Sequence, residues 1–158
     1  MKQTARRGLL MLTVAASAGL AIFAVMVYRA VSIERADRAE AAQRFAAVRA
    51  TLPPGQAVLT LDEAGNVVRR EAPRGGTPAS IRRLRVLVYY ADGQRVVSAD
   101  VPFWFFRIKG PAAQYALRDT GFDLDRLGIT PADLQRYGPA VVIDRSRSNG
   151  DLLLVWTE

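Results

Sequence analysis

The chain has 158 residues, half of them hydrophobic, which suits one folded domain with an appendage and is far from the profile of a disordered protein. It contains no cysteine and no histidine, so disulfides, thiolate chemistry and the commonest general base and metal ligand are excluded. The formal net charge of +7 comes almost wholly from arginine, a bias that a GC-rich genome also produces and that alone does not indicate phosphate recognition.

An apolar run without a charged side chain extends from Gly8 to Tyr28. About 20 helical residues cross a hydrocarbon core of about 30 Å, so residues 8–28 are predicted to form a transmembrane helix with the lipid bilayer as its partner. Three basic side chains lie within residues 1–7, and the positive-inside rule therefore places this N-terminus in the cytoplasm.

The alternative to this anchor is a cleaved signal peptide, whose apolar region usually has about 7–15 residues followed by small residues at the cleavage site. Here the small residues Ala16, Ser17 and Ala18 fall in the middle of the run, not at its end. No cysteine is present for a lipoprotein anchor. We therefore expect an uncleaved, single-pass signal anchor.

Residues 29–52 have a helical composition without glycine or proline, and the sequence Pro-Pro-Gly at 53–55 ends the segment. Apolar side chains recur on one helical face at spacings of four, three and four residues, at Ala41, Phe45, Val48 and Leu52. This pattern predicts one juxtamembrane helical stalk. There are two interpretations of its narrow apolar stripe. We favour packing onto the chain's own domain; the alternative is a homo-oligomer that forms a parallel coiled coil.

Residues 53–158 are predicted to form an extracytoplasmic α+β domain, a small antiparallel sheet with short helices. Strand patterns at 57–61 and 66–71 flank the turn sequence Asp-Glu-Ala-Gly, and longer ones at 81–90 and 94–101 flank Ala-Asp-Gly. Helix signals follow in 110–119 and in 129–139. In the second segment Thr130 is the expected N-cap, with Asp133 in the first turn and Gly138 as terminator.

A last hairpin closes the chain, with Asn149 and Gly150 between two apolar runs. This dipeptide predicts a tight type I′ turn, because both of its residues tolerate a positive φ.

Catalytic and metal-binding patterns are missing from the sequence. Asp119, Asp123 and Asp125 lack the glycine and glutamate spacing of a calcium loop, so we interpret them as structural or solvated. Neither a nucleophile elbow nor a phosphate-binding or dinucleotide-binding glycine motif occurs. The sequence therefore predicts a non-enzyme without cofactor or metal, and a hydrolase with paired carboxylates remains the weaker alternative.

A basic stretch lies between residues 67 and 90, where Glu71 is the sole acid. Its arginines could contact an anionic surface or steer a charged partner: Arg69, Arg70, Arg74, Arg82, Arg83 and Arg85. The alternative is a solvated sheet face whose guanidinium stems cover apolar neighbours. No nucleic-acid-binding motif appears, and an extracytoplasmic location argues against nucleic acid as a partner.

Four consecutive aromatic side chains occupy residues 103–106. Read as a strand, they place Phe103 and Phe105 on one face and Trp104 and Phe106 on the other. A strand buried on both faces is one interpretation; a partner surface at Trp104, Phe106 and Arg107 is another, because interface cores are rich in aromatics and arginine. Insertion into the bilayer is the third.

These observations predict a single-pass protein of a bacterial inner membrane with its C-terminal domain in the periplasm. The first functional hypothesis is a non-catalytic accessory, scaffold or assembly subunit that binds other envelope or membrane proteins. The second is a sensor or ligand-binding module for a small molecule or polyanion. A flat apolar patch at the aromatic row would favour the first hypothesis, and a deep pocket with convergent polar groups would favour the second.

Overall fold

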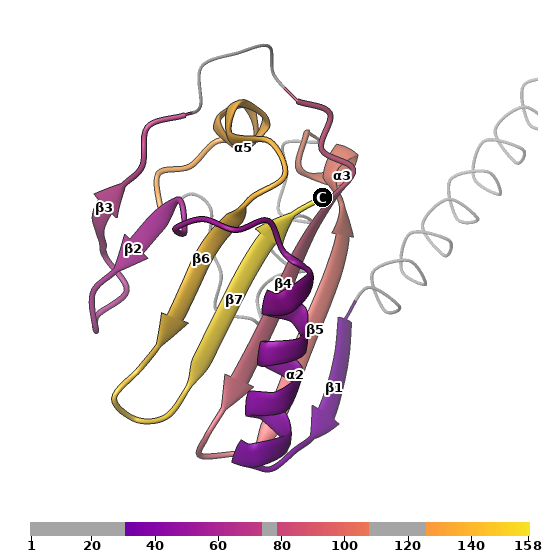
Figure 1. Ribbon diagram of the computed structural model, residues 1–158, viewed down its shortest axis with the longest axis vertical. Coiled ribbons are helices and arrows are strands. Elements are labelled where there is room, and N and C mark those ends of the chain that lie inside the picture. Colours follow the sequence, from indigo (N-terminus) through magenta and orange to yellow (C-terminus); the bar gives the residue numbers. More distant parts are fainter. Residues whose placement is uncertain (1–30, 74–78, 108–125) are drawn as a thin grey trace, which may run out of the picture. The chain divides into compact units, whose positions relative to one another are not determined.

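A computed structural model describes residues 31–73, 79–107 and 126–158 (Figure 1). The predicted membrane span at 8–28, the helix predicted at 110–119 and the three aspartates at 119, 123 and 125 lie outside these residues. Within them, none of the helices has the length and apolarity that a membrane crossing requires. Residues 31–158 belong to one compact unit.

A seven-stranded sheet organises this unit, in the order β1-β5-β4-β7-β6-β2-β3. Its strands are β1 (Val31–Arg35), β2 (Leu59–Leu61), β3 (Val67–Arg70), β4 (Arg83–Tyr90), β5 (Arg95–Pro102), β6 (Val141–Ser146) and β7 (Leu152–Thr157). The expected α+β class is confirmed, but the sheet is mixed, because β2 runs parallel to β6 with Leu59 opposite Ile143. The other pairs are antiparallel. The parallel pair arises because α2 (Arg38–Thr51) carries the chain from the β1 edge across one face to β2 (Figure 1).

Helix α2 begins at its N-cap Asp37, whose side chain accepts a hydrogen bond from the Glu40 N–H at 2.8 Å, and ends before the prolines. Ala41 and Phe45 are fully buried against the sheet, with Val48 and Leu52 packed beside them. The expected packing of this stripe onto the chain's own domain is confirmed. Since these side chains are covered, they are not available for a coiled coil.

The prediction of one continuous helix over 29–52 is wrong for Val31–Arg35, which forms β1 and pairs with β5. Three features separate β1 from α2. The segment begins with Val-Ser-Ile, which suits a strand. The Ala36 N–H donates to the Gln94 carbonyl at 2.9 Å, and Asp37 starts a new helix. The helical composition of the segment concealed this edge strand because its hydrogen-bonding partner is more than 60 residues away in the sequence.

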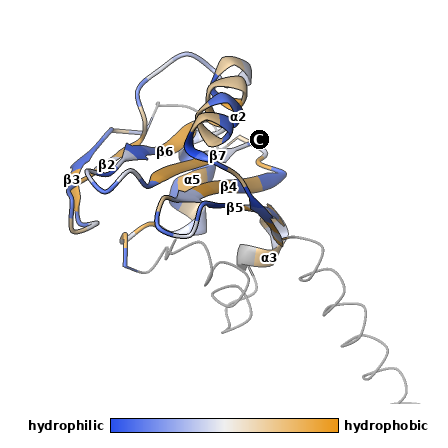
Figure 2. Ribbon diagram, turned by 90° about the horizontal axis from the view of Figure 1, so that it is seen from below, coloured by the Kyte–Doolittle hydropathy of each residue, from blue (hydrophilic) through white to orange (hydrophobic). Residues whose placement is uncertain are grey.

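The two faces of the sheet bury different side chains, and α2 covers the first face, while α3 and α5 lie toward the other side (Figure 2). The core of the first face joins α2 to Leu87, Tyr89, Val96, Leu154 and Trp156. The second face carries the alternate residues of the same strands, all buried: Leu84, Val86, Val88, Val97, Ala99, Val101, Ile143 and Val155. Both faces of the central strands are therefore apolar, as in a sheet covered on both sides.

The three predicted hairpins are confirmed: β2 pairs with β3, β4 with β5 and β6 with β7. The type I′ turn predicted at the last hairpin is wrong. The Gly150 N–H donates to the Arg147 carbonyl at 3.0 Å, and the Arg147 N–H donates to the Asp151 carbonyl at 2.9 Å. Gly150 has a φ of 93°, whereas Asn149 is not at positive φ. This is a three-residue loop with glycine at the left-handed position, the next most common way to close a hairpin.

Helix α5 (Pro131–Tyr137) confirms the capping prediction in detail. The Thr130 hydroxyl accepts from the Asp133 N–H, and the Asp133 carboxylate accepts from the Thr130 hydroxyl at 2.7 Å and from the Thr130 N–H at 2.9 Å. These hydrogen bonds, above all the one from the Thr130 hydroxyl, lower the pKa of Asp133 below its ordinary value. Gly138 ends the helix with a φ of 69°.

The aromatic row is a helix, not a strand. Pro102 ends β5, since proline has no N–H for the sheet ladder, and α3 (Phe103–Arg107) follows at once. Phe103 and Phe105 are nevertheless buried, at 2% and 6% exposure, while Trp104 is 50% exposed. The predicted division between buried odd and exposed even residues therefore holds for these three side chains, but the strand that was to produce it does not exist.

A candidate anion-binding pocket

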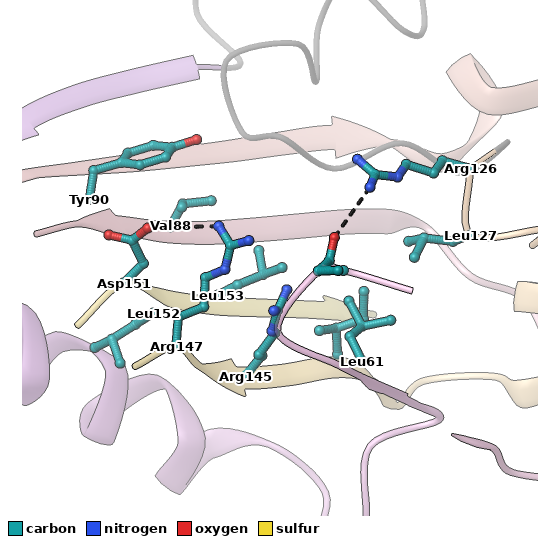
Figure 3. A pocket seen from close by; sticks show the side chains of 13 residues that line it. Leu61, Val88, Tyr90, Arg126, Leu127, Arg145, Arg147, Asp151, Leu152 and Leu153 are labelled. Atoms are coloured by element: carbon teal, nitrogen blue, oxygen red, sulfur yellow. Dashed lines mark hydrogen bonds and ion pairs between the residues drawn. The ribbon is translucent and has the colours of Figure 1, made fainter. Parts of the chain in front are cut away.

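A pocket of about 180 Å³ lies on the second face of the sheet, away from α2 (Figure 3). Strands β4, β7, β6 and β2 contribute its lining from Val88, Leu153, Arg145 and Leu61. The strand register places Leu153 opposite both Val88 and Arg145, so these three side chains form one row across the sheet. The pocket is therefore built on a sheet row in which an arginine stands beside aliphatic neighbours.

Arg145 is on this row because of the alternation along β6. Ile143 points into the second face, Asp144 points to the first face, and Arg145 returns to the second face. On the first face, Asp144 accepts two hydrogen bonds from Arg49 of α2, at 2.6 and 2.8 Å. The neighbouring Arg145 has no such carboxylate among the residues that the structure describes. Its Nη2 is buried and finds no hydrogen-bond partner, as judged over the residues that the structure describes.

Two further arginines, Arg126 and Arg147, enter the pocket from loops and are held by the β2–β3 turn. Nη2 of Arg126 donates to the Ala64 carbonyl at 3.2 Å, and Nη2 of Arg147 donates to the Glu63 carbonyl at 3.0 Å. Arg145 stands between them in the close-up view (Figure 3). Three guanidinium groups from two separate segments, residue 126 and the end of β6, thus converge on one short turn.

The β2–β3 turn is itself fixed by Asp62. Its carboxylate accepts hydrogen bonds from the backbone N–H and the side-chain amide of Asn66, at 2.8 and 3.0 Å, and the bond from the Asn66 backbone is the main reason why the pKa of Asp62 is lowered. Gly65 completes the turn with a φ of 88°. A side chain at Gly65 would place its Cβ 3.7 Å from Nη1 of Arg145 and 4.0 Å from Nη2 of Arg126. The absence of a side chain here leaves the turn backbone close to both guanidiniums.

The segment that carries Arg126 is held by Arg70 of β3. Nη2 of Arg70 donates to the carbonyls of Leu127 and Gly128, both at 3.0 Å. Leu127 is buried and lines the pocket. Arg70 was predicted to contact an anionic surface. Its hydrogen bonds instead hold the backbone of one wall of the pocket in place.

One carboxylate, that of Asp151, lies in the lining. Its Oδ1 accepts from the Ala91 N–H at 2.9 Å, its Oδ2 accepts from the Asn149 side chain at 2.8 Å, and Nη1 of Arg147 lies 4.0 Å away. Both oxygens are thus used to close the β6–β7 loop against the β4–β5 loop. At the same end, the Arg95 guanidinium stacks over the ring of the lining residue Tyr90, with 4.9 Å from Cζ to the ring centroid.

This arrangement suits binding more than proton transfer. Arginine stays charged at every physiological pH and offers planar donors that match carboxylate and phosphate oxygens. Among the described lining residues, three guanidiniums face one carboxylate that is already hydrogen-bonded, so the charge that these residues supply is positive on balance. The chemistry offered by these side chains is the neutralisation and orientation of an anion.

The other predicted basic residues do not join this site. Arg69 pairs with Glu71 at 2.6 Å, and Arg83 pairs with Asp100 at 2.6 Å. Arg85 lies 3.5 Å from Asp100 and 3.4 Å from Glu158. Strands β7, β6 and β2 separate β4 from β3, so these side chains form two groups, not one patch. Arg82 is exposed beside β4, and Arg74 lies outside the described residues.

Of the partner surface predicted at Trp104, Phe106 and Arg107, the structure describes only the side chain of Trp104. Trp104 is half exposed and contacts the Phe105 ring edge-on, with 6.0 Å between ring centroids. The backbone of Phe106 and Arg107 belongs to α3, and their side chains lie outside the described part of the structure. The row thus presents one described aromatic side chain to solvent and buries two.

Sequence reasoning missed Arg126, Arg145 and Arg147. One signal was available: the alternation in residues 141–146 puts Arg145 on the same side as Ile143, where an apolar residue is expected. The other two arginines are brought to the site by loops, and no local pattern marks them.

No group of three or more acidic side chains that could hold a metal ion occurs among the described residues. Comparisons of the chain with protein-family models, with curated proteins and with solved structures found no match.

Proposed function

We propose that the chain is a single-pass membrane protein whose folded domain is a non-catalytic module that binds a small anionic ligand. The observation that carries this proposal is the buried Nη2 of Arg145, which has no hydrogen-bond partner among the described residues. Of the two hypotheses from the sequence, a pocket with convergent polar groups favours the ligand-binding module.

The physical argument is the cost of an uncompensated charge. Arg145 is only partly buried as a residue, but its Nη2 is buried, and a buried N–H group without a hydrogen bond is costly. The like charges of Arg126 and Arg147 add to that cost. The buried Nε of Arg85 and Oδ1 of Asp100 also lack partners, but there the two opposite charges face one another at 3.5 Å. Among the described residues, no such counter-charge is paired with Arg145. An anionic ligand would supply it, together with acceptors for the free N–H groups.

The anchor is the second part of the proposal and rests on the apolar run from Gly8 to Tyr28. It places the domain on the periplasmic side of a bacterial inner membrane, where a ligand-binding module would meet small extracytoplasmic anions.

The test is calorimetric titration of the full-length chain, in neutral-detergent micelles and Tris buffer, with sodium phosphate and sodium benzoate. We expect saturable binding of at least one anion to the unaltered chain. Arg145→Met should weaken it about tenfold or more, since a hydrogen bond to a charged group contributes about 1.5–3 kcal/mol. Arg82→Met is the matched control, because Arg82 is exposed and outside the pocket lining.

Two results would contradict the proposal. One is the absence of saturable binding of either anion to the unaltered chain. The other is an equal loss of binding in Arg82→Met and Arg145→Met, which would indicate general attraction to a basic surface, as first considered for residues 69–85.

A second candidate function, that of an accessory subunit docked to another membrane or envelope protein, is supported by Trp104 alone. Half-exposed tryptophan is a frequent binding anchor. A photo-crosslinking residue at position 104, compared with one at Val68, another exposed hydrophobic residue, tests it in native membranes. A discrete crosslinked protein at 104 and not at 68 supports docking, and the same products at both positions contradict it.

A further inference from the structure

The aliphatic part of the pocket lining limits what the anion can be. Below and beside the guanidiniums lie Leu61, Val88, Leu127, Ile143 and Leu153. Val88, Leu127 and Ile143 are themselves buried, so the floor of the pocket belongs to the hydrophobic core of the second face. A purely inorganic anion would meet the arginines but would leave this apolar floor against water.

The size of the pocket gives the second limit. Its volume of about 180 Å³ slightly exceeds the ~150 Å³ of a cavity known to hold benzene. A ring or short alkyl chain of about six carbons, joined to one oxyanion group, fits this volume. A long acyl chain does not.

The positions of the charged and apolar groups give the third limit. Arg145 lies beside Leu153 across the β6–β7 pair, and Arg147 lies farther along toward the loop. Arg126 and Leu127 approach together from the same turn. Arg145 and Arg126 thus each have an aliphatic neighbour in the lining, as expected for a ligand with a charged head and an apolar body.

We infer, resting on the proposed function, that the ligand is a small amphipathic oxyanion: a carboxylate or comparable oxyanion head on an apolar body of about six carbons. The head accepts hydrogen bonds from Arg145, and from Arg126 or Arg147 beside it. The body lies on Val88 and Leu153. Burial of apolar surface then adds to the electrostatic attraction.

The test is a ligand series on the unaltered full-length chain in neutral-detergent micelles, with acetate, benzoate, hexanoate, decanoate and inorganic phosphate. We expect benzoate and hexanoate to bind at least about tenfold more tightly than acetate and phosphate. Titration of Arg145→Met in the same micelles corrects for partitioning into detergent. Decanoate should gain nothing beyond hexanoate after this correction, because the pocket has no room for four more carbons.

Leu153→Asn provides a test of the apolar floor at a half-buried position, because the two side chains have the same number and branching of heavy atoms. It should reduce benzoate binding about tenfold while leaving phosphate binding within about twofold. If this variant does not fold, the ligand series on the unaltered chain still decides the question.

The outcomes separate this inference from the function on which it rests. Phosphate or acetate bound as tightly as benzoate overturns the amphipathic ligand and leaves the anion-binding module standing. Affinity that keeps rising to decanoate overturns it in favour of a lipid-like anion whose chain extends outside the pocket. No saturable binding of any anion overturns both.

Discussion

Two neighbouring residues of β6 show how one arginine can stabilise the fold while another serves a site. Asp144 is matched by Arg49 through two hydrogen bonds, whereas Arg145 has a buried nitrogen without a partner among the described residues. Proteins retain such unfavourable groups where function requires them. A substitution that removes the Arg145 guanidinium should therefore raise the stability of the domain and weaken anion binding.

The first prediction follows from this contrast. Arg145→Met keeps a long, unbranched side chain and removes a buried N–H donor that has no partner among the described residues, so the unliganded domain should become more stable by about 1–3 kcal/mol. Arg49→Met removes a partly exposed pair and should instead destabilise it by about 0.2–1 kcal/mol. Denaturant unfolding of the full chain in neutral detergent measures both. Equal destabilisation by the two variants would show that Arg145 has a compensating partner.

The second prediction concerns pH and the cap of α5. An aspartate in an unfolded chain has a pKa of about 3.9, and the pKa of Asp133 is lower in the folded protein. Its contribution to stability is therefore complete above about pH 4 and is lost as the pH falls through the folded-state pKa. Asp133→Asn should cost roughly 1 kcal/mol or less at pH 7 and almost nothing at the acid end of this window.

Thr130→Ala is the companion variant, since it removes the hydroxyl that contributes most to the shift. Combining it with Asp133→Asn should cost less than the sum of the two single changes, because both belong to one capping box. A cost of Asp133→Asn that is independent of pH from 7 to 3, measured by thermal unfolding, would contradict this assignment.

At the scale of elements, the sequence predicted those structures that local rules decide. Turn sequences marked all three hairpins, and Thr130, Asp133 and Gly138 marked α5. It did not predict β1 or α3. Both depend on where distant strands end: β1 on an open edge of β5, and α3 on Pro102 leaving the ladder.

The third prediction tests the aromatic helix. Phe103→Ala or Phe105→Ala should cost about 3–5 kcal/mol, because each removes a buried ring and leaves a cavity. Trp104→Ala should cost about 1 kcal/mol or less, since half of this side chain already meets water. Unfolding should be measured on the full chain, because a fragment beginning at Thr51 would lack α2 and expose the core around Phe45. Comparable losses in all three variants would contradict the orientation of α3.

At the scale of the molecule, the pocket could not be predicted because its residues come from four strands and three turns or loops. Their meeting depends on β7 lying between β4 and β6 and on β2 returning beside β6. No local sequence pattern contains that order. The basic surface expected from the sequence named other arginines, most of which are paired within the fold.

The fourth prediction concerns the anchor. A compartment-sensitive reporter fused after Glu158 should be active only on the extracytoplasmic side, and the full-length chain should resist extraction from membranes by alkaline carbonate. A mature protein that begins near Ser32 would contradict the uncleaved anchor. Such a cut would also fall inside β1 and would remove Val31, the first residue of the strand that covers the edge of β5.

The central claim, that Arg126, Arg145 and Arg147 form an anion site, is tested most directly by nuclear magnetic resonance of the arginine side-chain N–H groups during titration of the full-length chain with benzoate. We expect the signals of these three residues to shift together along one saturable curve, while those of Arg49 and Arg82 stay in place. Small, non-saturating shifts spread over all arginines, or saturable shifts confined to Arg82 and Arg83, would contradict the claim.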